Sequence, residues 1–255
     1  MDYQIQGKTA IVTGAGGGLG AAVVEKLMCE GCNAVIADIH DEGKIVPWLR
    51  EINEKYSASA CYVHTDVSSE EQINHLFDVA LEKFQQVDIV INNAGIWPTA
   101  YVREMTTESF KKTLDINLIG PFMLCRRMLN YCLDKERKGK IVNLVSQAAF
   151  GGSTSGHAHY AASKAGLVGF TISLAREAAP YGINVNAVAP GIMETPIIAE
   201  ALLDPQRRQK YLDRIPLGRV ATAEEVARIV LFLVSSQSDY MTGATLDATG
   251  GMLMR

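Results

Sequence analysis

Short apolar runs alternate with longer stretches of helical periodicity along this chain. The runs are rich in β-branched residues and predict strands at Lys8–Thr13, Asn33–Ala37, Ala60–His64, Val87–Ile91, Lys140–Val145, Ile183–Val188 and Thr245–Asp247. Within them, a segment such as Ile141–Val145 is apolar at almost every position. Strands of that kind are typically buried on both faces, as in a parallel sheet.

Helical spacing predicts helices between these strands. The clearest is Ser68–Phe84, where apolar side chains recur on one face and Ser69 with Gln72 matches a capping box. A long helical region contains Gly120-Pro121, where we expect a kink or a break because proline lacks a backbone donor. The helical stretches apart from Ser68–Phe84 are Leu19–Cys29, Thr107–Leu133 (the region just described), Tyr160–Ala178 and Glu224–Val234.

This alternation indicates the α/β class. We expect a single doubly wound Rossmann-type domain over residues 1–255, with a mainly parallel seven-stranded sheet and helices on both of its faces. Residues 191–222 are the least regular stretch. A long irregular segment inside a compact domain is more typical of a substrate lid than of a linker.

Composition narrows the class of protein. Hydrophobic residues make up 48% and charged residues 20% of the 255 positions, which excludes disordered, collagenous and disulfide-framework chains. A net charge of −4 argues against a nucleic-acid partner. The sequence shows neither a membrane span nor the basic start of a signal peptide. We therefore expect a cytoplasmic protein without a membrane partner.

Five cysteines without framework spacing fit reduced thiols. Cys29 and Cys32 have the spacing of a metal knuckle or a redox pair, but no second pair completes a tetrahedral site. We interpret them as a helix end, with Gly31 as the stop, and Cys125 and Cys132 as core residues. No metal is expected.

A glycine-rich turn, Thr13–Gly20, follows the first strand and opens the first helix. Glycines there allow the backbone to approach a phosphate, and the helix N-terminus supplies free N–H groups. Asp38 ends the second strand, at the place where a carboxylate accepts hydrogen bonds from the adenosine ribose and repels a 2′-phosphate. Because no Arg or Lys lies in the turn or between Asp38 and Lys44, the sequence predicts NAD rather than NADP.

Together with motifs further along, these residues resemble the short-chain dehydrogenase/reductase family over essentially the whole chain. The motifs that match are T-G-x-x-x-G-x-G at Thr13–Gly20, N-N-A-G at Asn92–Gly95, Y-x-x-x-K at Tyr160–Lys164, P-G-x-x-x-T at Pro190–Thr195, and a catalytic tetrad of Asn117, Ser146, Tyr160 and Lys164. The loop between Ser146 and Tyr160 is one residue longer than is common in the family, which leaves the shape of the pocket open.

The resemblance implies a set of cofactor-binding residues. In this family Asp66 and Val67 would flank the adenine, and the residues after Pro190 would hold the nicotinamide amide. The implied set is Gly14, Gly18, Leu19, Gly20, Asp38, Asp66, Val67, Asn93, Gly95, Tyr160, Lys164, Pro190, Gly191, Ile192, Met193 and Thr195.

Tyr160 and Lys164 are four residues apart and share one helix face. A free tyrosine has a pKa of about 10 and is a poor base near neutral pH. A lysine charge about 5 Å away, at an effective dielectric of about 20, favours the tyrosinate by roughly 3 kcal/mol, or about two pK units. We therefore predict that Tyr160 accepts the hydroxyl proton of an alcohol or donates a proton to the oxygen of a ketone.

Ser146 and Asn117 complete the predicted chemistry. Ser146 ends the fifth strand, at the sheet edge where ligands bind, and its hydroxyl can orient the substrate oxygen. No G-x-S-x-G surrounds it, so it is not a hydrolase nucleophile. In the resembling family the main chain at Asn117 holds a water that links the lysine to solvent.

Four side chains are the first candidates for the substrate pocket: Trp97, Gln147, Phe150 and His157. His157 and His159 lack the partners of a metal site. The helix from Tyr160 is rich in small residues and apolar on all sides, as in a core or a subunit interface. The family is usually dimeric or tetrameric, and we favour a homotetramer, with a dimer as the alternative.

These observations predict an NAD-dependent oxidoreductase that interconverts a secondary alcohol and a ketone. We favour a small polyol, sugar or other hydroxylated metabolite as substrate. A 3-oxoacyl carrier-protein reductase or a hydroxysteroid dehydrogenase is the alternative. A non-catalytic NAD-sensing protein on the same fold is a more remote one, which the intact tetrad argues against.

Overall fold

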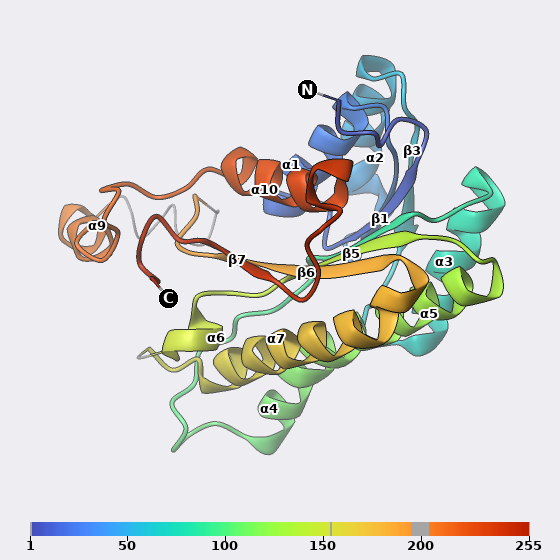
Figure 1. Cartoon of the computed structure of the whole chain (residues 1–255). Helices are drawn as coiled ribbons and strands as arrows, with labels where there is room; N and C mark the ends of the chain where they lie inside the picture. The colour runs from blue at the N-terminus through green and yellow to red at the C-terminus, as the bar shows by residue number, and fades with distance from the viewer. Residues whose placement is uncertain (1, 154, 195–203, 255) are drawn as a thin grey trace.

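A seven-stranded parallel sheet forms the centre of the protein, in the order β3-β2-β1-β4-β5-β6-β7. The computed structural model describes residues 2–153, 155–194 and 204–254. Helices cover both faces of the sheet (Figure 1). The predicted fold class is confirmed.

Each predicted strand is present, with its ends displaced by at most two residues. The strands are β1 Thr9–Thr13, β2 Asn33–Asp38, β3 Ala60–His64, β4 Ile89–Asn92, β5 Gly139–Leu144, β6 Ile183–Pro190 and β7 Thr245–Ala248. Strands β1, β4 and β5 are buried at every position, because both of their faces lie under helices.

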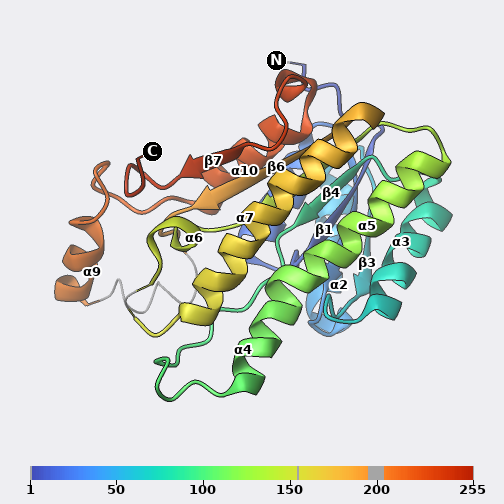
Figure 2. The same ribbon diagram turned by 60° about the horizontal axis from the view of Figure 1, so that its bottom comes forward.

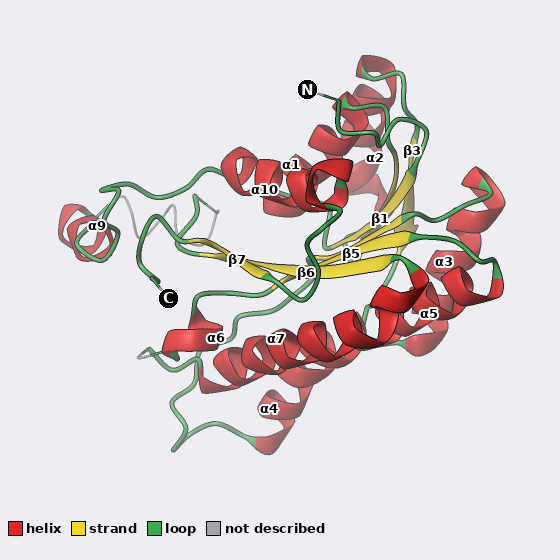
Figure 3. Cartoon of the chain, viewed as in Figure 1, coloured by secondary structure: helices red, strands yellow, loops and turns green. Residues whose placement is uncertain are grey.

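The helices form two layers. Helices α1, α2 and α10 lie on one face of the sheet, and α3, α5 and α7 on the other (Figures 1 and 3). Figure 2 shows α5 and α7 side by side across the second face. Their bounds are α1 Gly18–Cys29, α2 Glu42–Lys55, α3 Glu70–Phe84, α4 Thr107–Leu114, α5 Gly120–Asp134, α6 Ala148–Gly151, α7 Ala158–Ala178, α9 Pro205–Leu212 and α10 Ala223–Val234.

The expected break at Gly120-Pro121 does not occur. A π-helical turn, Asp115–Ile119, joins α4 to α5, and Gly120 keeps right-handed helical angles. Pro121 lies in the first turn of α5, where a missing backbone donor is tolerated. The wider turn absorbs the proline, and the helical path continues.

The start of α3 also differs in one detail from the prediction. The Ser69 side chain accepts a hydrogen bond from the Gln72 N–H, as expected of an N-cap. The Gln72 side chain, however, accepts from the Asp66 N–H at 2.8 Å. The helix is therefore capped on one side, and Gln72 anchors the loop that follows β3.

Three of the described helices were not predicted from the sequence: α2, α6 and α9. Only Ile45 and Ile52 of α2 are buried, and Pro47 lies inside it. Two buried apolar residues are too few to predict a helix from hydrophobic periodicity, and a proline in a sequence normally argues against a helix interior at that position.

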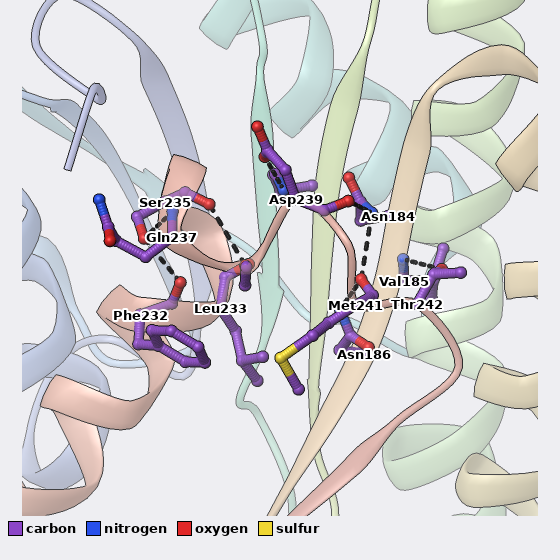
Figure 4. Close-up of polar contacts among 12 residues, drawn as sticks. Asn184, Val185, Asn186, Phe232, Leu233, Ser235, Gln237, Asp239, Met241 and Thr242 are labelled. Atoms are coloured by element: carbon purple, nitrogen blue, oxygen red, sulfur yellow. Dashed lines mark hydrogen bonds and ion pairs between the residues drawn. The ribbon is translucent and has the colours of Figure 1, made fainter.

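The connection from α10 to β7 is tied to β6 by side-chain amides (Figure 4). Asn184 donates to the carbonyls of Asp239 and Met241, and Asn186 donates to Met241 at 2.9 Å. Ser238 donates to the Leu233 carbonyl at the end of α10. These bonds position β7 alongside β6 as the last parallel strand.

The cysteines match their interpretation as structural residues. Cys29 ends α1, and Gly31 adopts a φ of +78° just beyond it. Burial raises the pKa of the thiols of Cys32 and Cys125 to about 12, so both are protonated and unreactive near neutral pH.

Candidate active site

The site lies at the carboxyl end of the sheet, where the chain order reverses between β1 and β4. The Asn93 side chain donates to the carbonyls of Thr13 and Gly14 at 3.0 and 2.8 Å. The Thr13 hydroxyl in turn accepts from the N–H groups of Asn93 and Ala94. The predicted N-N-A-G segment thus fixes the glycine-rich turn from the neighbouring strand.

Two glycines of the turn are required by close packing. A Cβ on Gly14 would lie 2.7 Å from the Ala94 Cα, and one on Gly20 would lie 2.7 Å from the Ala15 Cα. Gly14 also has a φ of +62°, which favours glycine. A Cβ on Gly17 or Gly18, by contrast, would meet no atom of the described residues within 4 Å. The turn is therefore open at the start of α1, where helical N–H groups can receive an anion.

Asp38 reaches the turn from the end of β2 and is only 8% exposed. Its Oδ2 accepts a hydrogen bond from the Gly16 N–H at 2.8 Å. Its Oδ1 accepts from the backbone N–H and the ring Nδ1 of His40, the latter at 2.6 Å. The carboxylate thus lies beside the open turn, as expected for a group that reads the adenosine ribose.

A cavity of about 190 Å³ opens beside the glycine turn. Residues of β5, α7 and the segments after β1, β4 and β6 surround it. Its lining is Leu19, Asn93, Gly95, Ile96, Trp97, Leu144, Val145, Ser146, Tyr160, Lys164, Pro190, Gly191 and Met193. Ser146, Tyr160 and Lys164, which the sequence places on two separate elements, are thus brought together.

Lys164 is 4% exposed and donates through Nζ to the Leu144 carbonyl at 2.7 Å. Burial lowers the pKa of its ammonium to about 8. Its Nζ lies 5.8 Å from the centre of the Tyr160 ring. A buried lysine with a lowered pKa is poised to lose or regain a proton near neutral pH.

Burial raises the pKa of the Tyr160 phenol, and hydrogen bonding with Ser146 lowers it. The Lys164 ammonium is directed to a main-chain carbonyl, and burial disfavours its own charge. The lowering of the Tyr160 pKa by Lys164 stays a prediction.

Asn117 lies fully buried in the π-helical turn. Its side chain accepts from the Ile96 N–H at 2.8 Å and donates to the Ile96 carbonyl at 2.9 Å and to Ser163 at 3.1 Å. Because Pro121 has no N–H, the Asn117 carbonyl lacks the donor that an α-helix would supply four residues later. The predicted water relay at this main chain remains a prediction.

The structure divides the substrate-pocket candidates. Trp97 lines the cavity, with its ring stacked on His157 at 4.3 Å and edge-on to Tyr160 at 6.4 Å. His157 is buried behind it and bonded through Nδ1 to the Pro98 carbonyl. Gln147 and Phe150 are not among the lining residues, and Phe150 packs against the small apolar cluster that includes Val145. His157 thus supports the pocket wall without lining it.

The remaining cofactor candidates also separate. Pro190, Gly191 and Met193 line the cavity, whereas Ile192 lies in a neighbouring hollow toward α10. Asp66 and Val67 follow β3 at the same sheet edge, outside the cavity. Thr195 lies outside the described residues.

A buried polar network behind the site was not predicted. The Asn92 side chain donates to Asn143 at 2.8 Å, and Asn143 donates to Thr171 at 2.9 Å. These residues link β4, β5 and α7, and Asn92 and Asn143 directly precede the lining residues Asn93 and Leu144. The only sequence signal was the asparagine that interrupts each apolar strand.

The described residues form neither a metal-binding cluster nor a membrane-spanning helix. Across residues 2–153, 155–194 and 204–254, no three His, Cys, Asp or Glu side chains gather in a way that would hold a metal ion. Within this same part of the chain, no helix is both long and apolar enough to span a bilayer.

Comparisons with known proteins agree with this geometry. Residues 14–253 match the family model described as enoyl-(acyl carrier protein) reductase. The 3-oxoacyl-[acyl-carrier-protein] reductase FabG of Aquifex aeolicus is 40% identical over 253 residues, covering 99% of this chain and 100% of the relative. The 3beta-hydroxysteroid dehydrogenase 1 of Eggerthella lenta is 42% identical over 254 residues, covering 100% and 97%.

Solved structures show the same relationship. A provisionally assigned 2-deoxy-d-gluconate 3-dehydrogenase from Agrobacterium tumefaciens, with bound NADP, superposes with a TM-score of 0.90 at 34% identity, covering 100% of this chain and 99% of that one. Fold, site and relatives agree over the full length. The protein is an oxidoreductase of CH–OH groups and belongs to the short-chain dehydrogenase/reductase family.

Proposed function

We propose that this protein is an NAD-dependent dehydrogenase that interconverts a secondary alcohol and a ketone at Tyr160. The observation that carries the proposal is the convergence of Ser146, Tyr160 and Lys164 on one cavity beside the glycine turn. The steric requirement for glycine at positions 14 and 20, and the open space at 17 and 18, fit a dinucleotide whose phosphates approach the backbone.

Asp38 supports the choice of NAD. It is buried, it faces the turn, and it is already oriented by the Gly16 N–H. A fixed carboxylate accepts hydrogen bonds from ribose hydroxyls and repels a 2′-phosphate. The Agrobacterium tumefaciens protein has NADP bound in its structure. The test below therefore compares turnover with NAD and with NADP for the present protein.

The residues of this chain divide the reaction among them. When bound, the nicotinamide supplies the hydride acceptor and a positive charge. Ser146 orients the substrate oxygen, and Tyr160 takes the hydroxyl proton in oxidation or returns it in reduction. Lys164, with its pKa near 8, holds Tyr160 in the required state and exchanges its own proton with solvent through the main chain at Asn117.

We favour a small polyol, sugar or other hydroxylated metabolite as substrate. Ser146 and Tyr160 supply polar groups in the cavity for a hydroxylated substrate. The exposed ring of Trp97, 41% accessible, offers a flat surface on which the C–H face of a ring alcohol can pack.

A second candidate is a hydroxysteroid. Tyr101 and Val102 follow Trp97 closely in the chain and are 60% and 73% exposed. An apolar rim of this kind fits a larger alicyclic alcohol, and the Eggerthella lenta relative carries that name. A 3-oxoacyl thioester, after the FabG relatives, is the third class to test.

The test is NADH formation by the purified protein with sugars, polyols, hydroxysteroids and 3-hydroxyacyl thioesters, with NAD and NADP in parallel. Tyr160→Phe should abolish turnover and retain cofactor binding, and Tyr101→Phe is a matched control on the rim. Faster turnover with NADP would contradict the assignment of Asp38. Cofactor binding without turnover of any substrate would favour an NAD-sensing protein.

We also propose that the protein is a homotetramer. The lid predicted at residues 191–222 falls partly outside the described residues, which omit 195–203. The outer face of α7 exposes small residues, among them Ala162, Ala165 and Gly169, and Phe122 and Ile172 are each about two-fifths exposed nearby. A flat apolar helix face of this kind suits packing against a second copy. Light scattering after size-exclusion chromatography would distinguish a tetramer from a dimer or monomer.

A further inference from the structure

A second cavity lies at the end of the sheet opposite the candidate active site. Its volume is about 790 Å³, within the range of small-molecule sites. Its walls include Lys8 and Asp88, which directly precede β1 and β4, and the first residues of β5 and β6. Because the strands are parallel, these amino ends lie together, and Tyr160 lies at the other end. None of the lining residues belongs to the proposed cofactor or substrate site.

The charge around this cavity is positive. Four basic and two acidic side chains line it, namely Lys8, Arg137, Lys138, Lys140, Asp88 and Asp239. The basic groups therefore exceed the acidic ones by two, although the chain as a whole carries a net charge of −4. The C-terminal end of α7, next to the lining residue Ala179, adds a partial negative charge of about half an elementary charge. The balance still favours an anion.

Arg137 forms a fixed part of the wall. Its Nη2 donates to the Gln86 and Asp88 side chains, each at 2.9 Å. The second oxygen of Asp88 accepts from the Thr9 N–H at 2.9 Å, so both oxygens of this carboxylate are engaged. The guanidinium has five N–H donors, and its Nε is buried without a hydrogen-bond partner among the described residues. Arg137 therefore keeps donor capacity that its contacts with Gln86 and Asp88 do not use.

Lys140 is a second fixed cation. Its side chain is 10% exposed, and its Nζ donates to Asp239 Oδ1 at 2.7 Å. The Asp239 carbonyl accepts from the Asn184 side chain at 3.1 Å (Figure 4). This pair is thus held in place between the start of β5 and the loop before β7, and its exposed carboxylate partly screens the Lys140 charge.

The two remaining cations are the charges available to a ligand. A Cβ on Gly182 would lie 3.0 Å from the Lys138 Cγ, so the Lys138 stem packs against a glycine whose φ is +73°. Lys8 is half-buried just before β1. Within residues 2–153, 155–194 and 204–254, neither Lys8 nor Lys138 forms an ion pair with a carboxylate.

We propose that this cavity binds a small molecule that carries a phosphate group. The two unpaired ammonium groups match the two negative charges of a phosphate dianion, and an arginine fork suits its oxygens. A concave site of this volume suits a small molecule. The proposal is independent of the proposed function, because the two cavities lie at opposite ends of the sheet and share no lining residue.

The experiment is a phosphorus NMR titration of inorganic phosphate with the whole protein at constant ionic strength. It is run at about pH 8, where phosphate is mainly the dianion, with and without saturating NAD. The test variant is Lys8→Gln/Lys138→Gln, which removes both unpaired charges. The matched control is Lys111→Gln/Lys112→Gln, which removes the same charge from exposed positions on α4.

We expect the dissociation constant of phosphate to rise at least about tenfold in Lys8→Gln/Lys138→Gln, because two charges within about 4–5 Å of the ligand are lost. The control should change it less than about twofold, because salt screens distant charges. Asp239→Asn should lower it about threefold, since Lys140 loses its counter-charge. A gain in affinity does not arise from partial unfolding, so this third variant separates binding from folding.

Four outcomes would overturn the proposal. An equal loss in both double variants would show a general attraction of anions to the protein. Displacement of phosphate by NAD would place the ion in the cofactor site. Tighter binding of citrate than of phosphate would assign the cavity to polycarboxylates. Absence of binding to the wild type at up to about 50 mM phosphate would exclude the site.

Discussion

Replacing Lys164 with methionine should stabilise the fold while it abolishes the reaction. The Lys164 side chain is almost fully buried, and its ammonium donates a hydrogen bond to the Leu144 carbonyl. Methionine has a similar length and no charge, so it can fill the same space. Buried charged groups are often replaced by apolar groups of similar volume without loss of stability.

The size of the effect follows from the lysine pKa. Burial lowers this pKa from 10.5 to about 8, a difference of about 2.5, which corresponds to about 3 kcal/mol of folding free energy below pH 8. Losing the hydrogen bond leaves the Leu144 carbonyl without this donor, at a cost of about 1–2 kcal/mol. The Lys164→Met variant should therefore be about 1–2 kcal/mol more stable at pH 7.

The stability difference between Lys164→Met and the wild type should depend on pH. Because folding lowers the Lys164 pKa, the native protein binds fewer protons than the unfolded chain between about pH 8 and pH 10. Wild-type stability arising from this group therefore rises with pH in that window, and the full cost applies below it. The advantage of Lys164→Met should disappear by about pH 10. Other groups are common to both proteins and cancel in the difference.

Urea unfolding followed by circular dichroism, at pH 7 and at pH 10, measures this difference. Protein concentration is held constant, because association of subunits changes apparent stability. Lys112→Met, at an exposed position on α4, is the matched control and should change stability by less than about 0.5 kcal/mol. The reasoning would be refuted if Lys164→Met were the less stable protein at pH 7, or if its advantage did not shrink as the pH rose.

Three further predictions concern stability. His159 is fully buried and burial lowers its pKa, so the free energy of unfolding of the wild type should fall as the pH drops below about 6.5. Chemical unfolding of His159→Asn at pH 5 and pH 7 should show a smaller fall, and an equal fall would exclude His159 as the cause. Gly20→Ala should lower the free energy of unfolding by about 1–3 kcal/mol because its Cβ would meet backbone atoms. Gly43→Ala, on α2 where a Cβ meets no described atom, should raise it by about 0.5 kcal/mol. Thermal unfolding measures both, and similar effects of the two variants would contradict the steric argument. Thr222 and Glu225 form the capping box of α10, so Thr222→Ala should cost about 1 kcal/mol in urea unfolding, and an unchanged midpoint would show that the cap is dispensable.

The sheet could be predicted from the sequence because its strands are buried on both faces. The middle of β1 and of β5 consists of consecutive β-branched or small apolar residues, Ala10–Val12 and Ile141–Val142, so the local pattern predicts both strands. Helix α2 could not be predicted in the same way. It buries only Ile45 and Ile52 and contains Pro47, and its place is determined by packing against the sheet.

The residues of the site were predicted by motif, but their electrostatics were not. The distance from Tyr160 to Lys164 follows from helical spacing, and it suggested a simple attraction between the phenolate and the ammonium. The structure of β5 and of the loop after β4 determines which carbonyl accepts the hydrogen bond from Lys164. It also determines how deeply Tyr160 and Lys164 are buried. Burial raises the Tyr160 pKa, in the direction opposite to the shift that helical spacing suggested. The contact of His40 with Asp38 is likewise decided by the turn after β2.

Several features that oppose local stability meet at this edge of the sheet. Lys164 is buried with its charge, a π-helical turn holds Asn117, and asparagines interrupt two buried strands. Each departs from what packing alone would favour, and the residues concerned line the cavity or contact or adjoin residues that line it. Strain and buried polarity that converge on one point are expected where a site must be held in place for chemistry. Under the proposed function, the buried polar network would support the site, and a Lys164 pKa of about 8 would allow proton exchange near neutral pH.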